Sequence, residues 1–557
     1  MRAKIGLLFL AMVMAASSGF AAEGLQWWAN PWSESFRSAS TANLLEDDFD
    51  LMLDPARLSS IEGYRLYTNL SNQVYKNDEV FDDNSDGYYL LGGSGKLFEL
   101  GHAGLLYDRY HYNYVDSQTV NQSGYQDLDA NGTYDRLTVG EQTYNDQGRY
   151  SESHWWLGYG RDMGPGKFGV LFYHQAENNL NRPWGDNFVQ HQSVTDLLTN
   201  HVTSDISVTS TSLEQIDRSV NGGALSYWMP MGDKIDLGLA GGINIYLANQ
   251  YDTLTYSSRS YNPSVPSTNG TTIDSTAIWD IIPNDHVGLE INLRGSMVYK
   301  WNENVKTRTD LMFTTLGAER SDGIITSEYS RLDAFAVPTG TISTNTTRTS
   351  GSEEVFQDNH NLGLMLGSKT TAKLGEKVEM AVGLGFGTNR RDYSMEFVNP
   401  YVERIVYNDG DPVTYNDYVQ ITEGNYNYRH VYTEATKMII APVGVEFHIT
   451  EPFVFRLGAF PSFSFFDATE TYHWENTPTK VTYIDAINNT TSDTTETIPA
   501  TYTPYNGVAY NYKYAESWVN YTYGAGWKIS DNLQIDLMGF SQLTDLTNWK
   551  LSAVFKF

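Results

Sequence analysis

The sequence contains no cysteine, few prolines and no long apolar run after its first twenty residues. Among 557 residues there are 0 Cys and 17 Pro. An exported chain without cysteine cannot use disulfides, so its stability must come from secondary structure and packing. A membrane-spanning helix needs about 20 consecutive apolar residues, and no later window supplies them without charges. An inner-membrane helical protein is therefore excluded.

Positive charge is also scarce, since 37 Lys and Arg stand against 67 Asp and Glu and give a formal net charge of −30. This balance argues against nucleic acid or an anionic lipid surface as a partner, and it is compatible with cation binding or a preference for cations. The abundant residues are Tyr (39), Phe (24), Trp (13) and Gly (47). They suit twisted strands and the aromatic belts of membrane barrels.

The N-terminus has the pattern of a secretory signal peptide. Arg2 and Lys4 precede an apolar run over 5–16, and small residues follow as far as Ala22. A charged start, a short apolar stretch and a small-residue exit predict a signal peptide over 1–21, cleaved after Ala21. The protein is therefore expected to be exported.

The last ten residues alternate with a period of two. Leu551, Ala553, Phe555 and Phe557 share one parity, and polar residues occupy most of the other. This period predicts a β-strand with one apolar face. The ending resembles the closing strand of bacterial outer-membrane β-barrels. In that class a C-terminal Phe is typical and helps the barrel assembly machinery to recognise its substrate. The resemblance implies that Phe557 is an assembly signal at the periplasmic rim, facing lipid.

Similar alternation recurs along the chain, for example over 287–299, 305–313 and 378–386. Short turns are predicted at 99–102, 162–166, 229–234, 301–304, 374–377, 449–452 and 529–532. Long polar connections are predicted over 72–86, 116–148, 179–212, 257–284, 321–356, 398–427 and 473–507. Short and long connections alternate, which is the asymmetry of outer-membrane barrels.

The sequence therefore predicts an all-β protein, a closed antiparallel transmembrane β-barrel over 59–557. Counting segments between connections gives about sixteen strands, with fourteen to eighteen possible. The turns would be periplasmic and the long loops extracellular, in the outer membrane of a Gram-negative bacterium. Outer-membrane lipid, the assembly machinery and small solutes are the expected partners, and the oligomeric state stays undetermined.

In such a barrel the polar parity points into the lumen. The candidate lumen and selectivity residues are Glu290, Asn292, Arg294, Lys306, Arg308 and Asp310. Charges of both signs on adjacent strands can set ion preference. Ion pairs that stabilise the wall without selecting a solute explain the same residues equally well.

Two polar segments carry the start of a calcium-binding loop, D-x-[DN]-x-[DN]-G. The candidate ligands are Asp82, Asn84 and Asp86 in the first, and Asp127, Asp129, Asn131 and Asp135 in the second. Alternate oxygen ligands can converge on one hard cation. Both segments lack the acidic twelfth position, where Gly93 and Thr138 stand. Calcium is the one cofactor that the sequence suggests.

Residues 22–58 are neither a strand nor a clean helix. Their stretch LLEDDFDLMLDPARL resembles the segment before the first strand in the outer-membrane long-chain fatty-acid transporter family. There an Asp-Asp pair precedes an Asn-Pro-Ala-x-Leu motif, and the N-terminal segment folds into the barrel as a hatch. Here Asp54 replaces the Asn, and sixteen strands exceed that family's fourteen. A hatch and a loosely docked periplasmic leader both remain open.

Three functions are compatible with these patterns. The main hypothesis is a porin-like passive diffusion channel for small polar or cationic solutes. One alternative is a hatch-gated transporter of hydrophobic compounds. Another is a surface-binding or adhesion protein whose loops, such as 337–352 and 484–504, act on a barrel anchor. Enzymatic activity is not expected, because the His191-Gln192-Ser193 string is predicted in a polar loop without a third catalytic member.

Overall fold

The computed structural model describes residues 36–71, 87–128, 130–182, 188–262, 271–336, 342–408, 417–476, 480–485, 491–494, 507–540 and 549–557. The predicted signal peptide and the rest of 1–35 lie outside these ranges. The elements are α2 (Phe36–Ser40), α3 (Asp48–Leu53), η1 (Pro55–Ser60), β1 (Arg65–Ser71), β2 (Gly87–Leu97), β3 (Gly101–Gln126), β4 (Arg136–Met163), β5 (Gly166–Arg182), β6 (Phe188–Asp196), β7 (His201–Met231), β8 (Ile235–Asn262), β9 (Thr271–Lys300), β10 (Val305–Ala336), β11 (Ile342–Leu374), β12 (Val378–Asn408), β13 (Tyr418–Ile440), β14 (Val443–His448), β15 (Phe453–Asn476), β16 (Lys480–Asp485), β17 (Thr491–Thr494), β18 (Ala509–Ser530), β19 (Leu533–Phe540) and β20 (Trp549–Lys556).

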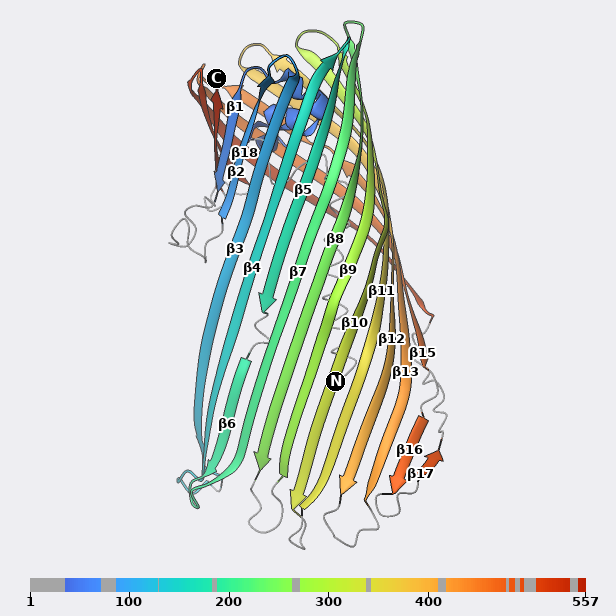
Figure 1. The fold of residues 1–557 in the computed structure, drawn as a ribbon. Coiled ribbons are helices and arrows are strands. Elements are labelled where there is room, and N and C mark those ends of the chain that lie inside the picture. Colours follow the sequence, from blue (N-terminus) through green and yellow to red (C-terminus); the bar gives the residue numbers. More distant parts are fainter. Residues whose placement is uncertain are drawn as a thin grey trace.

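All described strands belong to one antiparallel sheet that closes on itself (Figure 1). β5 and β6 form successive parts of one barrel strand, and so do β13 and β14. β16 and β17 form a small hairpin beside β13. The closed ring therefore contains sixteen strands. This confirms the predicted fold class, and no helix in the described part of the chain is long and apolar enough to cross a membrane.

The ring closes between the first and last strands. β1 pairs with β20 in a register that sets Leu66 opposite Phe555 and Thr68 opposite Ala553. Beyond β20, the backbone amide of Phe557 donates to the carbonyl of Tyr64 at 3.0 Å. The Phe557 side chain is 73% exposed, at the barrel end that carries the short turns. The predicted place beside the first strand agrees with these contacts, and its role in assembly stays a prediction.

Successive side chains on each strand point to opposite faces of the barrel wall. On β9, Leu289, Ile291 and Leu293 are exposed to the outside, while Glu290 and Asn292 between them are buried inside. Exposed apolar side chains recur at this height on β8, β11 and β12. Such an outer apolar band is what a strand needs to face lipid, whereas the inner parity can stay polar.

The predicted long loops are wrong in extent, because the strands continue far beyond the apolar band. β10 has 32 residues, which at about 3.4 Å per residue make roughly 110 Å. Crossing a bilayer takes only about ten tilted residues. Most of 116–148, 179–212, 257–284, 321–356 and 398–427 is strand. Both faces of these extensions are rich in Ser, Thr and Asn, so they lack the apolar alternation that identifies a strand in a sequence.

The short turns fall where the sequence predicts them. Residues 98–100, 232–234, 301–304, 375–377 and 449–452 connect neighbouring strands at one end of the barrel, the upper end in Figure 1. Short turns mark the periplasmic end of such barrels. The long β3–β13 extensions reach away from that end and would stand outside the cell.

The closure register can be tested by cross-linking, because the chain has no native cysteine. Thr68→Cys with Ala553→Cys should form a disulfide under mild oxidation, since directly opposite Cβ atoms lie about 5 Å apart. Thr68→Cys with Val554→Cys is the matched control, because a shift of one residue places the second thiol on the other face. Equal cross-linking of both pairs on a non-reducing gel would contradict the register.

Candidate functional site: the barrel interior

Residues 36–61, called the hatch segment here, fold inside the barrel near its short-turn end (Figure 1). Helix α3 begins with a capping box. The Asp47 carboxylate accepts from the Phe49 amide at 2.9 Å, and the Asp50 carboxylate accepts from the Asp47 amide. A capping box satisfies amides that a short helix otherwise leaves without partners. Two acidic residues of this run, Asp47 and Asp50, thus stabilise the N-terminus of α3.

Glycines of the wall make room for the hatch backbone. A Cβ on Gly169 of β5 would lie 2.1 Å from the carbonyl carbon of Pro55, and one on Gly160 of β4 would lie 2.4 Å from its oxygen. On the opposite wall, a Cβ on Gly444 of β14 would meet the Thr41 oxygen at 2.3 Å. Real Cβ atoms do not approach backbone this closely. The hatch is therefore seated against both sides of the lumen by backbone contact.

A first ion network joins α2 to the wall. Arg37 bonds both Glu446 oxygens at 3.0 Å and Glu379 at 2.8 Å. Arg456 in turn bonds Glu446 at 2.7 Å and Asp536 at 2.6 Å. Burial disfavours the charged form of Arg37, but Glu446 and Glu379 outweigh burial and raise the pKa of Arg37 above its usual value. The hatch thus supplies one cation to a wall that has an excess of carboxylates here.

A second network centres on Glu46 of the hatch. Its carboxylate bonds Arg57 of the hatch at 2.8 Å, Arg308 of β10 at 2.5 Å and Lys369 of β11 at 3.4 Å. Burial alone would raise the pKa of Glu46, yet Lys369, Arg57 and Arg308 lower it well below its usual value. Glu46 is therefore held ionised between three cations, two of which belong to the wall.

A third contact links the end of α3 to β9 and β7. Asp54 accepts from Arg294 at 2.6 Å and from the indole nitrogen of Trp228 at 2.9 Å. The guanidinium groups of Arg57 and Arg308 lie 5.4 and 5.5 Å from the centre of the Trp228 ring. Cations at such distances over an indole are attracted by its ring electrons.

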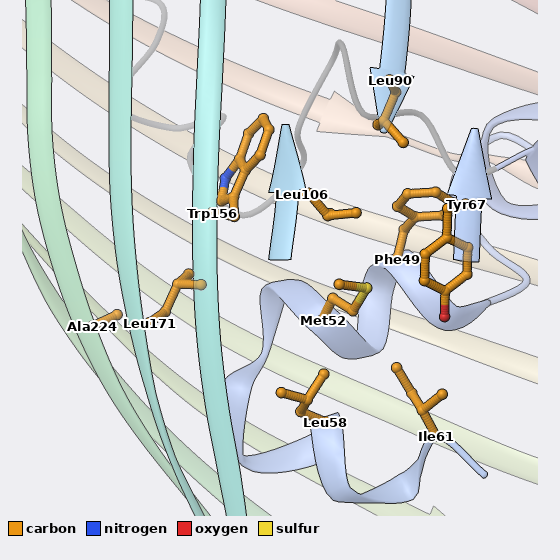
Figure 2. Close-up of a cluster of buried hydrophobic side chains, with 10 residues drawn as sticks. All are labelled: Phe49, Met52, Leu58, Ile61, Tyr67, Leu90, Leu106, Trp156, Leu171 and Ala224. Atoms are coloured by element: carbon orange, nitrogen blue, oxygen red, sulfur yellow. The ribbon is translucent and has the colours of Figure 1, made fainter. Parts of the chain in front are cut away.

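Apolar side chains of the hatch complete its seat. Figure 2 shows Phe49, Met52, Leu58 and Ile61 gathered with side chains from β1 to β5 and β7. Their wall partners are Tyr67, Leu90, Leu106, Trp156, Leu171 and Ala224. All ten are less than 8% exposed. An apolar cluster inside the barrel departs from the polar interior of water-filled porins.

The structure brings most of the predicted lumen residues into this region. Arg294 and Arg308 bond the hatch, and Asp310 bonds Arg308 at 2.9 Å. Glu290 lies further from the turns and accepts from Tyr246 at 2.7 Å and from the Asn244 amide at 3.1 Å. Asn292 bonds the same carboxylate and accepts from Thr314. Lys306 lies close to the turns and is exposed.

The sequence did not show which hatch residues pair with these wall charges. Asp54 and Arg294 stand 240 positions apart, and Glu46 and Arg308 stand 262 apart. The one available signal was the surplus of acidic residues in the stretch from Glu46 to Asp54.

The calcium candidates are placed only in part. Asp82, Asn84, Asp86 and Asp129 lie outside the described residues. Asp127 accepts from the backbone amides of Asn131 and Gly132, and Asp135 accepts from that of Leu128 at 2.8 Å. Within the described ranges, no three His, Cys, Asp or Glu residues form a group that could hold a metal. Calcium binding stays a prediction.

The His191 string does not lie in a loop as predicted. It belongs to β6, which pairs with β4 and β7. His191 bonds Asp205 at 2.8 Å on the barrel extension, and both side chains are about half exposed. The polar composition of this strand concealed it in the sequence.

Beyond the hatch, tyrosine hydroxyls of the inner face donate to carboxylates. Tyr432 donates to Glu434 on β13, and Tyr472 donates to Glu470 on β15. Tyr512 of β18 also donates to Glu470, at 3.2 Å. The inner face of β13, β15 and β18 therefore combines aromatic rings with negative charge.

Comparison with known proteins gives distant likeness only. No family model and no curated protein matches the chain. The P. putida toluene transporter TodX is 11% identical, with 95% of this chain and 99% of that chain covered and a TM-score of 0.36. The Ralstonia pickettii toluene transporter TbuX is 12% identical over 95% and 99%, with a TM-score of 0.32. The ferric yersiniabactin receptor FyuA of Yersinia pestis is 9% identical over 89% and 80%, with a TM-score of 0.26. None of these similarities identifies a function.

A bulky side chain on the hatch-facing wall should displace the hatch. Gly169→Leu would drive its side chain into Pro55 and Ala56, and we expect higher conductance in planar bilayers. The matched control is Gly367→Leu on β11, another inward glycine, where a Cβ would meet nothing within 4 Å. Equal conductance of the two variants and the parent would show that Gly169 does not seat the hatch.

Removing the charge of Glu46 should loosen the hatch. Glu46→Gln removes the carboxylate that Arg57, Arg308 and Lys369 share, and Arg308 keeps Asp310. The free energy of hatch opening should therefore fall by roughly 3 kcal/mol at pH 7. Hydrogen exchange of the hatch amides in the parent and in Glu46→Gln measures this change in opening free energy.

The pH dependence of this difference is set by the lowered pKa of Glu46. A carboxyl group whose pKa is lowered in the folded state stabilises that state at pH values above its unfolded-state pKa, near 4.5. This stabilisation is lost as the pH falls toward the folded-state pKa. The gap between parent and Glu46→Gln should therefore shrink only below about pH 4.5. A gap that closes already near pH 6 would contradict this assignment.

Proposed function

We propose that this protein is an outer-membrane transporter whose pore is closed by the hatch segment and opens when that segment moves. The observation that carries the proposal is that the hatch reaches from one wall of the lumen to the other. Helix α2 contacts β15, β18 and β19, and η1 contacts β3, β4, β5 and β7. A segment seated on both sides of a sixteen-stranded lumen obstructs the path that a solute would take.

The main hypothesis of an open, porin-like channel for polar or cationic solutes fits these contacts less well than a hatch-gated transporter. A passive porin needs a continuous water-filled passage. Here Arg37, Glu46 and Asp54 of the hatch bond five different strands, β9, β10, β11, β12 and β14. Asp54 is buried, Arg37 and Glu46 are partly buried, and all three are paired, so a free-energy source is needed to undock the hatch.

We further propose that the transported solutes are small compounds with apolar groups. The support is the composition of the inner face. Leu90, Leu106 and Trp156 cover the hatch with apolar surface, and tyrosine, phenylalanine and tryptophan rings follow along β13, β15 and β18. Such surfaces contribute about 25 cal/mol for each Å² of apolar area removed from water.

In this proposal the predicted selectivity residues have different tasks. Arg294 and Arg308 anchor the hatch, and Asp310 orients Arg308. Glu290 and Asn292 lie further from the short turns, where neutral side chains donate hydrogen bonds to Glu290. Their part in ion selectivity stays a prediction. The adhesion hypothesis also stays untested, since 337–352 and 484–504 lie partly in β11, β16 and β17 and otherwise outside the described residues.

A reversible tether between hatch and wall tests the proposal. The Ala56 amide donates to the Ser226 hydroxyl at 2.8 Å, so Ala56→Cys with Ser226→Cys should cross-link on oxidation. Cells that express the cross-linked protein should take up N-phenyl-1-naphthylamine, an apolar dye, no faster than cells without it, and reduction should restore uptake. The single-cysteine variants are controls. Equal uptake before and after reduction would show that transport does not require hatch movement.

A further inference from the structure

Glu470 occupies a distinctive place on the inner face of the barrel extension. It lies on β15, well beyond Arg456, which marks the level of the hatch on the same strand. Three neutral groups donate to its carboxylate. His430 Nε2 lies 2.8 Å from Oε1, Tyr472 donates to the same oxygen, and Tyr512 donates to Oε2 at 3.2 Å. Its side chain is 13% exposed.

Unlike the carboxylates at hatch level, Glu470 forms no ion pair with Arg or Lys among the described residues, whereas Glu446 binds two arginines. His430 is 0% exposed, and its Nδ1 has no hydrogen-bond partner within the described part of the chain. An imidazolium would need an acceptor for each N–H group. A neutral ring that donates from Nε2 satisfies the observed contacts, so the charge of Glu470 is not cancelled by His430.

Aromatic rings surround this carboxylate. Tyr472 stacks on His430 with centroids 4.8 Å apart and an interplanar angle of 9°, and it meets Tyr510 edge-on at 6.1 Å. Tyr512, which bonds Glu470, is 45% exposed. It shares the parity of Gly524, which faces the hatch, so its ring lines the inside.

We propose that Glu470 with the rings of Tyr472 and Tyr512 binds organic monocations that carry an apolar or aromatic group. This rests on the proposed function, because it names the class of solute that the inner face would receive. A half-exposed ring attracts a cation through its face, by about 0.5–2 kcal/mol. A partly buried carboxylate without an Arg or Lys partner adds Coulombic attraction that water screens only in part. A neutral solute gains only the ring contacts, and an anion is repelled.

Two charged groups near the site limit the choice of ligand. Arg391 of β12 stands opposite Glu434 in the register, bonds Asn359 at 3.3 Å and lies 5.8 Å from the centre of the Tyr393 ring. It therefore lies nearer to Glu434 than to Glu470, which faces Tyr432. One uncompensated charge remains at Glu470, which matches a monocation.

Calorimetric titration of the purified, folded protein tests the site. The probes are benzyltrimethylammonium, the neutral benzyl alcohol and the anionic benzenesulfonate. We expect benzyltrimethylammonium to bind at least tenfold more tightly than the other two. Glu470→Gln should weaken its binding about tenfold and leave the neutral probe unchanged. Equal affinity for the cation and the anion, or an unchanged affinity in Glu470→Gln, would overturn the proposal.

Two further variants separate binding from damage to the fold. Asp467→Asn removes one charge from the same strand, but on the outer face, where Asp467 bonds Lys513 at 2.9 Å. It should keep the affinity of the parent within about twofold. Tyr512→Phe keeps the ring and should retain binding, whereas Tyr512→Ala should weaken it about threefold or more. Equal losses in Asp467→Asn and Glu470→Gln would also overturn the proposal.

Failure of the cation-binding proposal can be distinguished from failure of the transport proposal. Cation binding is measured without any flux, and the cross-link joins Ala56 to Ser226 of β7, whereas Glu470 lies on β15. If the tethered protein binds benzyltrimethylammonium normally and also admits the dye, then the site is correct and the hatch mechanism is wrong. If the tether blocks the dye and Glu470→Gln binds like the parent, then the site is wrong.

Discussion

The interior of this barrel depends on pairing buried charges between the hatch and the wall. A carboxylate or guanidinium removed from water costs several kcal/mol unless a partner of opposite charge takes the place of its solvent. Arg37 and Asp54 meet that condition through Glu446 and Arg294 of the wall, and Glu46 meets it through Arg308 of the wall together with Arg57 of the hatch. Conversely, without the hatch Arg294 would lose Asp54, and Glu446 and Arg308 would each keep one wall partner, Arg456 and Asp310. The hatch and the wall thus stabilise each other.

Backbone geometry makes this pairing possible. The hatch backbone must lie close to the wall before its side chains can contact the wall charges. The neighbouring Gly160 and Gly169 permit that approach on one side of the ring, and Gly444 permits it on another. The period of two then places charged and small residues inside while leucine, isoleucine and phenylalanine face outward. The same alternation therefore supplies both the lipid-facing surface and the seat of the hatch.

The sequence predicted what is local and periodic. The apolar alternation of β9 and the terminal strand identified their faces, and the short turns placed the strand ends at one rim. The sequence did not predict the polar strand extensions, because a strand solvated on both faces has no hydrophobic period. The sequence also did not predict the ion-pair partners of Arg294 and Arg308. Pairing between residues more than 200 positions apart depends on the closed ring and leaves no local sequence pattern.

Two chemical environments follow each other along the lumen. At the level of the hatch, carboxylates are paired with arginine and lysine, whereas Glu290, Glu434 and Glu470 further out are held by tyrosine, asparagine or histidine. The first arrangement holds a plug. The second leaves negative charge beside aromatic rings, where a solute can use it.

The central claim is that the hatch is closed at rest and opens during transport, and the most direct measurement is the accessibility of Leu58. This side chain is 0% exposed between hatch and wall, and the chain has no other thiol. In Leu58→Cys, a water-soluble maleimide should label the protein very slowly at rest and at least tenfold faster while solute is being taken up. Rapid labelling without solute, or equal labelling in both states, would contradict the account.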